Sequence, residues 1–144
     1  MNAQAGDDSI HLSVPSDPAC MAIVRAVVEK VAGAAGFSEE ETGQIVLAVD
    51  EACANVIRHK YEGRRDQRIE LDARLDARRG CLEFLLRDYG PVRDPALFRG
   101  RELAEVRPGG LGLHIIRKVM DEVEFTPAQG GGMQLRLCKK PAAR

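Results

Sequence analysis

Five short segments of the chain alternate apolar with polar residues, whereas three longer segments repeat their apolar residues at helical spacing. Alternation with a period of two predicts strands with one face on a core and the other toward water. A mixed, mostly antiparallel sheet with helices on one face accounts for both patterns. The sequence therefore predicts an α/β (α+β) two-layer sandwich. The strands are expected at about residues 10–14, 69–75, 82–86, 123–125 and 133–137.

Each expected helix has a recognisable beginning. Asp17 is a natural N-cap before Pro18 and opens a first helix that ends near Gly36. Ser38 and Glu41 form a capping box that opens a second helix, ending near residue 61. A third helix follows directly from the glycines of "GGLGL". The residues expected on the buried faces of the second and third helices are Ile45, Val49, Ala52, Cys53, Val56, Leu113, Ile116, Val119 and Met120.

Length and charge limit the classes of protein to which this chain can belong. The 144 residues suit one domain, and a formal charge of −1 gives no general reason to bind nucleic acid or an anionic membrane. No signal sequence or membrane-spanning apolar run is seen, which predicts a cytoplasmic protein. A local basic cluster is interleaved with acids and predicts a solvated loop; its members are Arg58, Lys60, Arg64, Arg65 and Arg68.

The four cysteines are widely scattered, without a C-x-x-C pair or a histidine at zinc-ligand spacing. Neither a disulfide framework nor a zinc site is therefore expected. The sequence predicts reduced and mostly buried thiols at Cys20, Cys53, Cys81 and Cys138.

The second helix carries a polar stripe in "EACANVIRHKYEG". Glu51, Asn55 and His59 are spaced by four residues, so they lie on one slowly drifting face, away from the apolar face through Val49 and Val56. Taken alone, such a stripe is more typical of a solvated helix face than of a site.

Two further segments that follow this stripe in the chain contain candidate binding residues. "RDYG" places Asp88 at a strand end, where a carboxylate beside a glycine can accept from a buried amino group such as that of adenine. A long segment without a clear period, about residues 90–108, then predicts a functional lid. It leads to "GGLGL", whose free N–H groups and helix dipole suit an anion; the segment comprises Gly109, Gly110, Leu111, Gly112 and Leu113.

The order of "VDEACANVIRHKY", "RDYG" and "GGLGLHIIRKVMDEVEF" resembles the GHKL, or Bergerat-fold, ATP-binding superfamily. The resemblance is to its small bacterial branch of anti-sigma-factor serine/threonine kinases and covers about residues 10 to 139. It implies a Bergerat fold. Two positions depart from the family pattern: Val92, where many members have a glycine, and Met133 in "GGGMQL", where a threonine is frequent.

The resemblance also implies roles for individual residues. Glu51 would be the general base, and Asn55 would hold the magnesium ion that bridges the phosphates of ATP. Asp88 would recognise adenine, with Gly90 letting the base approach. Arg107 would neutralise charge on the γ-phosphate, and the residues 109–113 would cradle phosphate. His59 is expected to be a structural hydrogen-bonding residue.

The activity implied by the resemblance is that of an ATP- and magnesium-dependent protein serine kinase. Its expected partners are a STAS-domain antagonist and a sigma factor or similar regulator, with a homodimer possible within this family and with no direct binding of nucleic acid or membrane. The expected kinase domain spans residues 10–139, between tails at 1–9 and 140–144. The alternative is a catalytically silent nucleotide-binding module that sequesters a regulatory protein. A sensor histidine kinase fragment, a GHKL chaperone or a topoisomerase would need parts that this sequence lacks.

Overall fold

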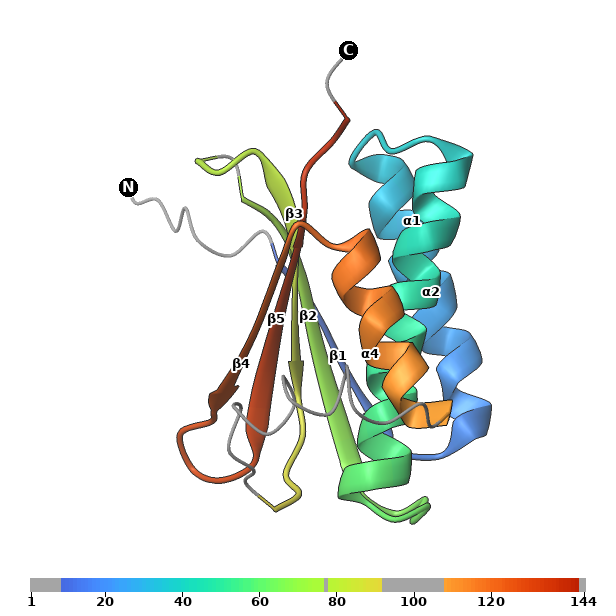
Figure 1. The fold of residues 1–144 in the computed structure, drawn as a ribbon, viewed down its shortest axis with the longest axis vertical. Coiled ribbons are helices and arrows are strands. Elements are labelled where there is room, and N and C mark those ends of the chain that lie inside the picture. The colour runs from blue at the N-terminus through green and yellow to red at the C-terminus, as the bar shows by residue number, and fades with distance from the viewer. Residues whose placement is uncertain (1–8, 77, 92–107, 143–144) are drawn as a thin grey trace.

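The fold is described from a computed structural model, which describes residues 9–76, 78–91 and 108–142. Helices cover one face of a five-stranded sheet in the order β1-β2-β3-β5-β4, as Figure 1 shows. Every described strand pairing is antiparallel, which confirms the expected two-layer sandwich. The strands are β1 (Ser9–Pro15), β2 (Arg68–Asp76), β3 (Cys81–Arg87), β4 (Glu122–Pro127) and β5 (Met133–Lys139).

The helices begin where the sequence predicts. Asp17 caps a 3₁₀ turn, η1 (Pro18–Cys20), by accepting from the N–H of Ala19, and α1 (Met21–Ala34) follows. The capping box of Ser38 and Glu41 is formed in both directions at the start of α2 (Glu39–Asn55). The chain then continues as one π-helical turn, η2 (Val56–Lys60), and α4 spans Pro108–Val119. Among the described residues, no helix is long and apolar enough to cross a membrane.

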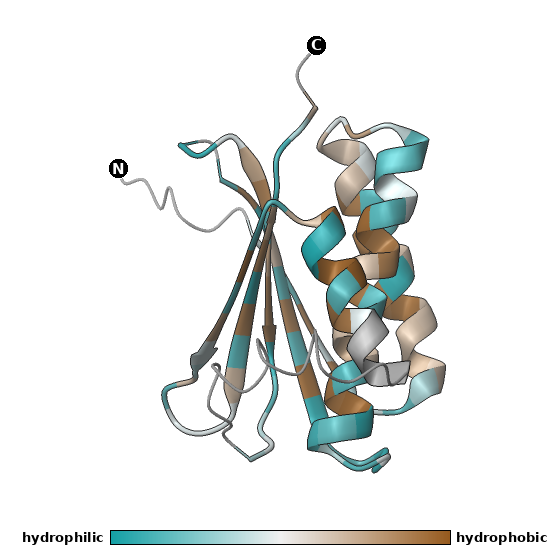
Figure 2. Cartoon of the chain, viewed as in Figure 1, coloured by the Kyte–Doolittle hydropathy of each residue, from teal (hydrophilic) through white to brown (hydrophobic). Residues whose placement is uncertain are grey.

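The core lies between the inner face of the sheet and the helices, where apolar stretches of both layers face each other (Figure 2). The predicted apolar faces of α2 and α4 are buried there, with Val119 packed at the edge. Two predictions fail at strand ends. Ile10, near the start of β1, and Leu75, near the end of β2, continue the alternation but are 50% and 59% exposed.

The outer face of the sheet carries a charged network rather than free polar side chains. Glu83 is buried there because Arg74 and Arg136 cover it, with Nε atoms 2.7 Å and 2.6 Å from its two carboxylate oxygens. Arg136 also donates to Glu122 across β4 and β5 at 2.8 Å.

The cysteine prediction is wrong for one pair. Cys81 and Cys138 form a disulfide with a Cα–Cα distance of 6.1 Å, because β3 and β5 are neighbours in the sheet although the two residues are 57 positions apart. Cys20 and Cys53 are free. Burial raises the pKa of the Cys53 thiol to about 12, so this thiol is unreactive near neutral pH.

Replacing Phe84 by alanine should lower the free energy of unfolding by about 3–5 kcal/mol, because this fully buried ring in the middle strand would leave a cavity. The Leu75→Ala variant is the control on the neighbouring strand, and its exposed side chain should matter by about 0.5 kcal/mol or less. Urea unfolding measures both. Equal losses in the two variants would contradict the burial of Phe84 in the core.

The pH dependence of stability should show a contribution from His11 on the edge strand. Its Nδ1 lies 2.5 Å from the Asp72 carboxylate, and this hydrogen bond, helped by the negative charges of Asp72 and Glu70, raises the pKa of His11. A raised folded pKa favours the protonated histidine, so the stabilisation is complete below the ordinary pKa of about 6.5 and is lost as the pH rises through the raised value.

The effect should stay below about 1 kcal/mol, because the pair is solvent-exposed. Unfolding of the His11→Gln variant at a series of pH values should lack this slope, while the exposed His114→Gln variant keeps it. If His11→Gln retains the full slope above pH 6.5, the contact does not stabilise the fold.

Candidate functional site

Glu51 and Asn55 lie one turn apart near the end of α2, and both are partly buried. Arg58, one turn further on, donates to Oδ1 of Asn55 at 3.2 Å, and its guanidinium is 4.0 Å from Oε2 of Glu51. A carboxylate, an amide oxygen and a cation therefore meet at one place. The sequence assigned Arg58 to a solvated loop; it lies instead on η2, beside the other two residues.

The glycine segment at the start of α4 lies against Glu51 and Asn55. A Cβ atom at Gly112 would lie 2.6 Å from Oε2 of Glu51 and 3.5 Å from Oδ1 of Asn55. Since real Cβ atoms essentially never come within 3.0 Å of another heavy atom, a side chain at this position would displace the carboxylate. The structure thus brings together two motifs that the sequence separates by more than fifty residues, at the contact between α2 and α4.

The other members of this segment differ in what they offer. Gly109, Gly110 and Leu111 lie in the first turn of α4, where backbone N–H groups have no partner within the helix. Leu113 is 7% exposed, and its side chain belongs to the hydrophobic core and not to the surface at the helix start. Arg107 and the lid residues 92–107 lie outside the described residues.

Asp88 follows β3 and is buried, at 5% exposure. Its Oδ1 accepts from the N–H of Gly90 at 2.9 Å and, more weakly, from that of Met133 at 3.4 Å. Its backbone N–H donates to the carbonyl of Met133 at 3.0 Å. These contacts fix the aspartate between the end of β3 and the start of β5.

Gly132 is a supporting residue that the sequence reasoning missed. Its φ is +80°, and a Cβ atom there would overlap the carbonyl oxygen of Asp88. The run of three glycines in "QGGGM" was a visible signal for a close backbone approach. What it approached could be known only from the pairing of β3 with β5.

The π-helical turn η2 carries two more residues into this region. Lys60, assigned by the sequence to a solvated loop, has a side chain that is 7% exposed and an Nζ 3.3 Å from Oδ1 of Asp88. The hydroxyl of Tyr61 donates to the carbonyl of Arg68 at 2.6 Å and accepts from the N–H of Tyr89 at 2.7 Å. Burial is the main cause that raises the pKa of Tyr61, which keeps this hydroxyl neutral. His59 is exposed on the same turn.

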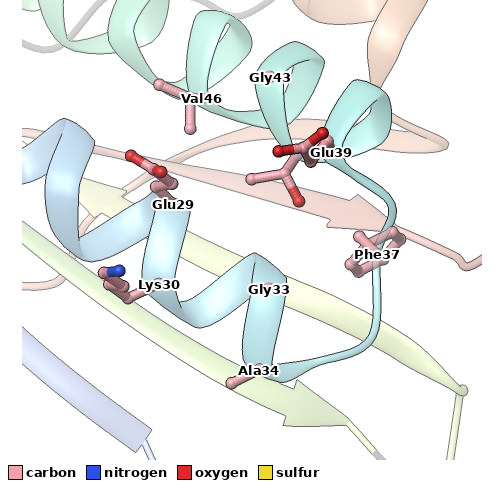
Figure 3. Close-up of a pocket in the computed structure, with 9 residues that line it drawn as sticks. Glu29, Lys30, Gly33, Ala34, Phe37, Glu39, Gly43 and Val46 are labelled. Atoms are coloured by element: carbon pink, nitrogen blue, oxygen red, sulfur yellow. The ribbon is translucent and has the colours of Figure 1, made fainter.

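These parts lie at one end of the molecule. Figure 1 shows the end of α2, the start of α4 and the end of β3 in the lower half of the view. A separate hollow of about 550 Å³ lies between α1 and the first half of α2 (Figure 3). It is lined by Glu29, Lys30, Phe37 and Val46 among others and contains none of the predicted site residues. The site is therefore defined by converging side chains and backbone, not by this hollow.

The chain is similar to known proteins in both sequence and structure. It is 29% identical over 134 residues to the serine-protein kinase RsbW of Bacillus pumilus, covering 85% of this chain and 81% of the relative. It is equally 29% identical over 131 residues to the serine-protein kinase RsbW of Bacillus subtilis, with the same coverage.

Two solved structures share the fold. A crystal structure of the RsbU and RsbW domains of a Mycobacterium tuberculosis protein superposes with a TM-score of 0.65 at 19% identity, covering 92% of this chain and 32% of that longer one. The SiaB–SiaC complex of Pseudomonas aeruginosa contains a chain that superposes with a TM-score of 0.64 at 14% identity, covering 90% and 88%.

The match that decides the family is to the histidine kinase-like ATPase domain, and it extends over residues 14–139, nearly the whole described chain. The convergence of Glu51, Asn55 and Gly112 lies within that range. This chain belongs to the family of histidine kinase-like ATPase domains.

Proposed function

We propose that this protein is an ATP- and magnesium-dependent serine kinase. It phosphorylates a STAS-domain antagonist and holds a sigma factor or similar regulator when that antagonist does not compete. The observation that carries the proposal is the contact of Gly112 with Glu51 and Asn55, which places a carboxylate and an amide oxygen at the start of a glycine-rich helix. The serine-protein kinase names of the relatives support the reaction class.

The residues present fit a nucleotide with its metal ion. Asn55 offers a neutral oxygen of the kind that hard cations accept, while the glycines of α4 offer N–H groups and the positive end of the helix dipole. Within residues 9–76, 78–91 and 108–142, no cluster of three or more His, Cys, Asp or Glu residues gathers around a metal position. Asn55 is therefore the proposed protein ligand, and a bound magnesium ion would neutralise phosphate charge.

Each remaining residue has one proposed task. Glu51 accepts the proton of the serine hydroxyl, and its place against Gly112 keeps it beside the phosphate-binding turn. Asp88 accepts from the amino group of adenine, and the N–H of Gly90 holds its carboxylate in place. Gly109, Gly110, Leu111, Gly112 and Leu113 bind phosphate through their backbone, and Arg107 neutralises the terminal phosphate. The proposed kinase domain spans residues 10–139, with residues 90–108 as its lid.

One observation favours the second candidate, a nucleotide-binding module without phosphate transfer. Arg58 contacts both the amide oxygen of Asn55 and the carboxylate of Glu51, the two atoms that the kinase mechanism needs. Its side chain is about half exposed and long enough to move aside, so the contact does not exclude catalysis. Phosphate transfer measured beside nucleotide binding separates the two candidates.

Replacing Glu51 by glutamine should reduce phosphate transfer by about 10² to 10⁴, because the amide cannot take the serine proton. Binding of Mg-ADP should change little, since this base contacts neither the adenine nor the metal in the proposed arrangement. Transfer from labelled ATP to a STAS-domain protein is measured beside calorimetric titration with Mg-ADP. The exposed Glu40→Gln variant on the same helix is the control. A Glu51→Gln protein that transfers at the wild-type rate would show that Glu51 is not the base, whereas a wild-type protein that binds Mg-ADP without transferring phosphate would favour the binding module.

Replacing Gly112 by alanine should slow transfer without weakening the fold. The added Cβ would push the Glu51 carboxylate aside, whereas alanine inside a helix stabilises by about 0.5–1 kcal/mol relative to glycine. Gly43→Ala is a matched control, because its Cβ would meet nothing within 4 Å on the exposed side of α2. Transfer rates and thermal unfolding are compared for both. A Gly112→Ala protein with an unchanged rate would show that the close contact has no part in catalysis.

A further inference from the structure

Lys60 has no task in the proposed reaction, yet it is the buried cation beside Asp88. Its side chain is 7% exposed, that of Asp88 is 6% exposed, and Nζ lies 3.3 Å from Oδ1. Lysine is almost never fully buried unless it is paired, because removing the ammonium from water is costly. The contact is therefore an integral part of this end of the fold, unlike the exposed ion pairs on the outer surface.

The π-helical turn η2 directs the side chain of Lys60 toward Asp88. In a regular α-helix a residue five positions after Asn55 would lie about 140° round the axis from it. In η2 the hydrogen bonds join residues five apart, as in the 3.0 Å bond from the N–H of Tyr61 to the carbonyl of Val56. The wider turn brings residue 60 back toward the face of Asn55. Such turns in helices occur frequently at functional sites.

Gly90 makes the space for this lysine. A Cβ atom at Gly90 would lie 3.0 Å from Cβ and 3.4 Å from Cε of Lys60. The aliphatic part of Lys60 thus packs on the bare backbone of the Asp88–Gly90 loop, while Nζ reaches the carboxylate. A side chain at Gly90 would therefore require Lys60 to move.

The polar contacts of Asp88 within the described part of the chain all use one oxygen. Oδ1 faces the N–H of Gly90, the N–H of Met133 and Nζ of Lys60. Oδ2 is the oxygen left to a ligand. As the anionic half of an ion pair, the carboxylate offers only acceptors. Such an oxygen suits a ligand that presents a donor and opposes one that presents a carbonyl.

We propose that Lys60 is a specificity-determining residue of the nucleotide site. By holding Oδ1, it fixes Asp88 so that Oδ2 accepts from the amino group at position 6 of a purine. A 6-oxopurine would place its carbonyl against that oxygen and leave two acceptors facing each other without a donor. Lys60 is thus a positioning residue that makes the site select 6-aminopurine nucleotides. The inference rests on the proposed binding of ATP at Asp88.

The test compares ADP with inosine diphosphate, which differ at position 6 in having an amino or an oxo group. Mg-ADP and Mg-IDP are titrated calorimetrically into the wild-type protein and into Lys60→Met, whose side chain fills similar space without a charge. The wild type should prefer ADP, and Lys60→Met should lose about tenfold or more of that preference. The control is Lys118→Met, the same change at an exposed lysine of α4, which should keep the wild-type ratio.

An Asp88→Asn background shows whether Lys60 acts through Asp88. There the change Lys60→Met should alter the ADP-to-IDP ratio no further, because the carboxylate it orients is gone. Lys60→Gln is the second variant if Lys60→Met does not unfold cooperatively, since glutamine can still donate to Oδ1 and should lose less of the ratio.

Three results would overturn the inference. A variant of Lys60 that keeps the wild-type ratio, even with both nucleotides bound more weakly, gives the lysine no role in selecting the base. If Lys60→Met lowers the ADP-to-IDP affinity ratio as much in the Asp88→Asn background as in the wild type, Lys60 does not act through Asp88. A wild-type protein that binds neither nucleotide up to millimolar concentration removes the proposed function itself, and this result is distinct from the other two.

Discussion

The buried ion pair of Lys60 and Asp88 joins the last turn of the long helix to the end of the middle strand. Two charges taken out of water destabilise a fold unless they pair with each other and their remaining donors and acceptors are hydrogen-bonded. Here Gly90 and Met133 supply those bonds to the carboxylate, and Tyr61 ties the adjoining backbone at Tyr89. Residues 90 and 132 are glycines, and the junction leaves no room for a side chain at either position.

The rest of the site is arranged around α2, which packs against both α1 and α4. Its apolar face lies in the core, while Glu51 and Asn55 face the start of α4, where Gly112 lets the two helices meet. The same helix therefore presents the proposed base and metal ligand on one side and, after its π-helical turn, the lysine that holds Asp88. The proposed base, the proposed metal ligand and the lysine that holds Asp88 would then be carried by one continuous helical element.

Several features could be predicted because their causes are local. The capping box at Ser38 and Glu41, the N-cap at Asp17 and the buried face through Ile45 and Val49 depend only on residues a few positions apart. The pattern failed where burial depends on what lies above a strand, as at Ile10 and Leu75. It also failed for Arg58 and Lys60, because charge interleaving describes a solvated loop and a π-helical turn equally well.

The sequence by itself determined the elements, the class of fold and the order of the three motifs, since hydrophobic period and caps act within single segments. Only the tertiary structure decided which distant residues meet. Glu51 lies against Gly112, Cys81 pairs with Cys138, and Gly132 fits over Asp88. Each contact follows from which strands and helices are neighbours, and that choice comes from burying the whole core at once. No local pattern carries this information, because the energy that selects neighbours is shared among all the elements.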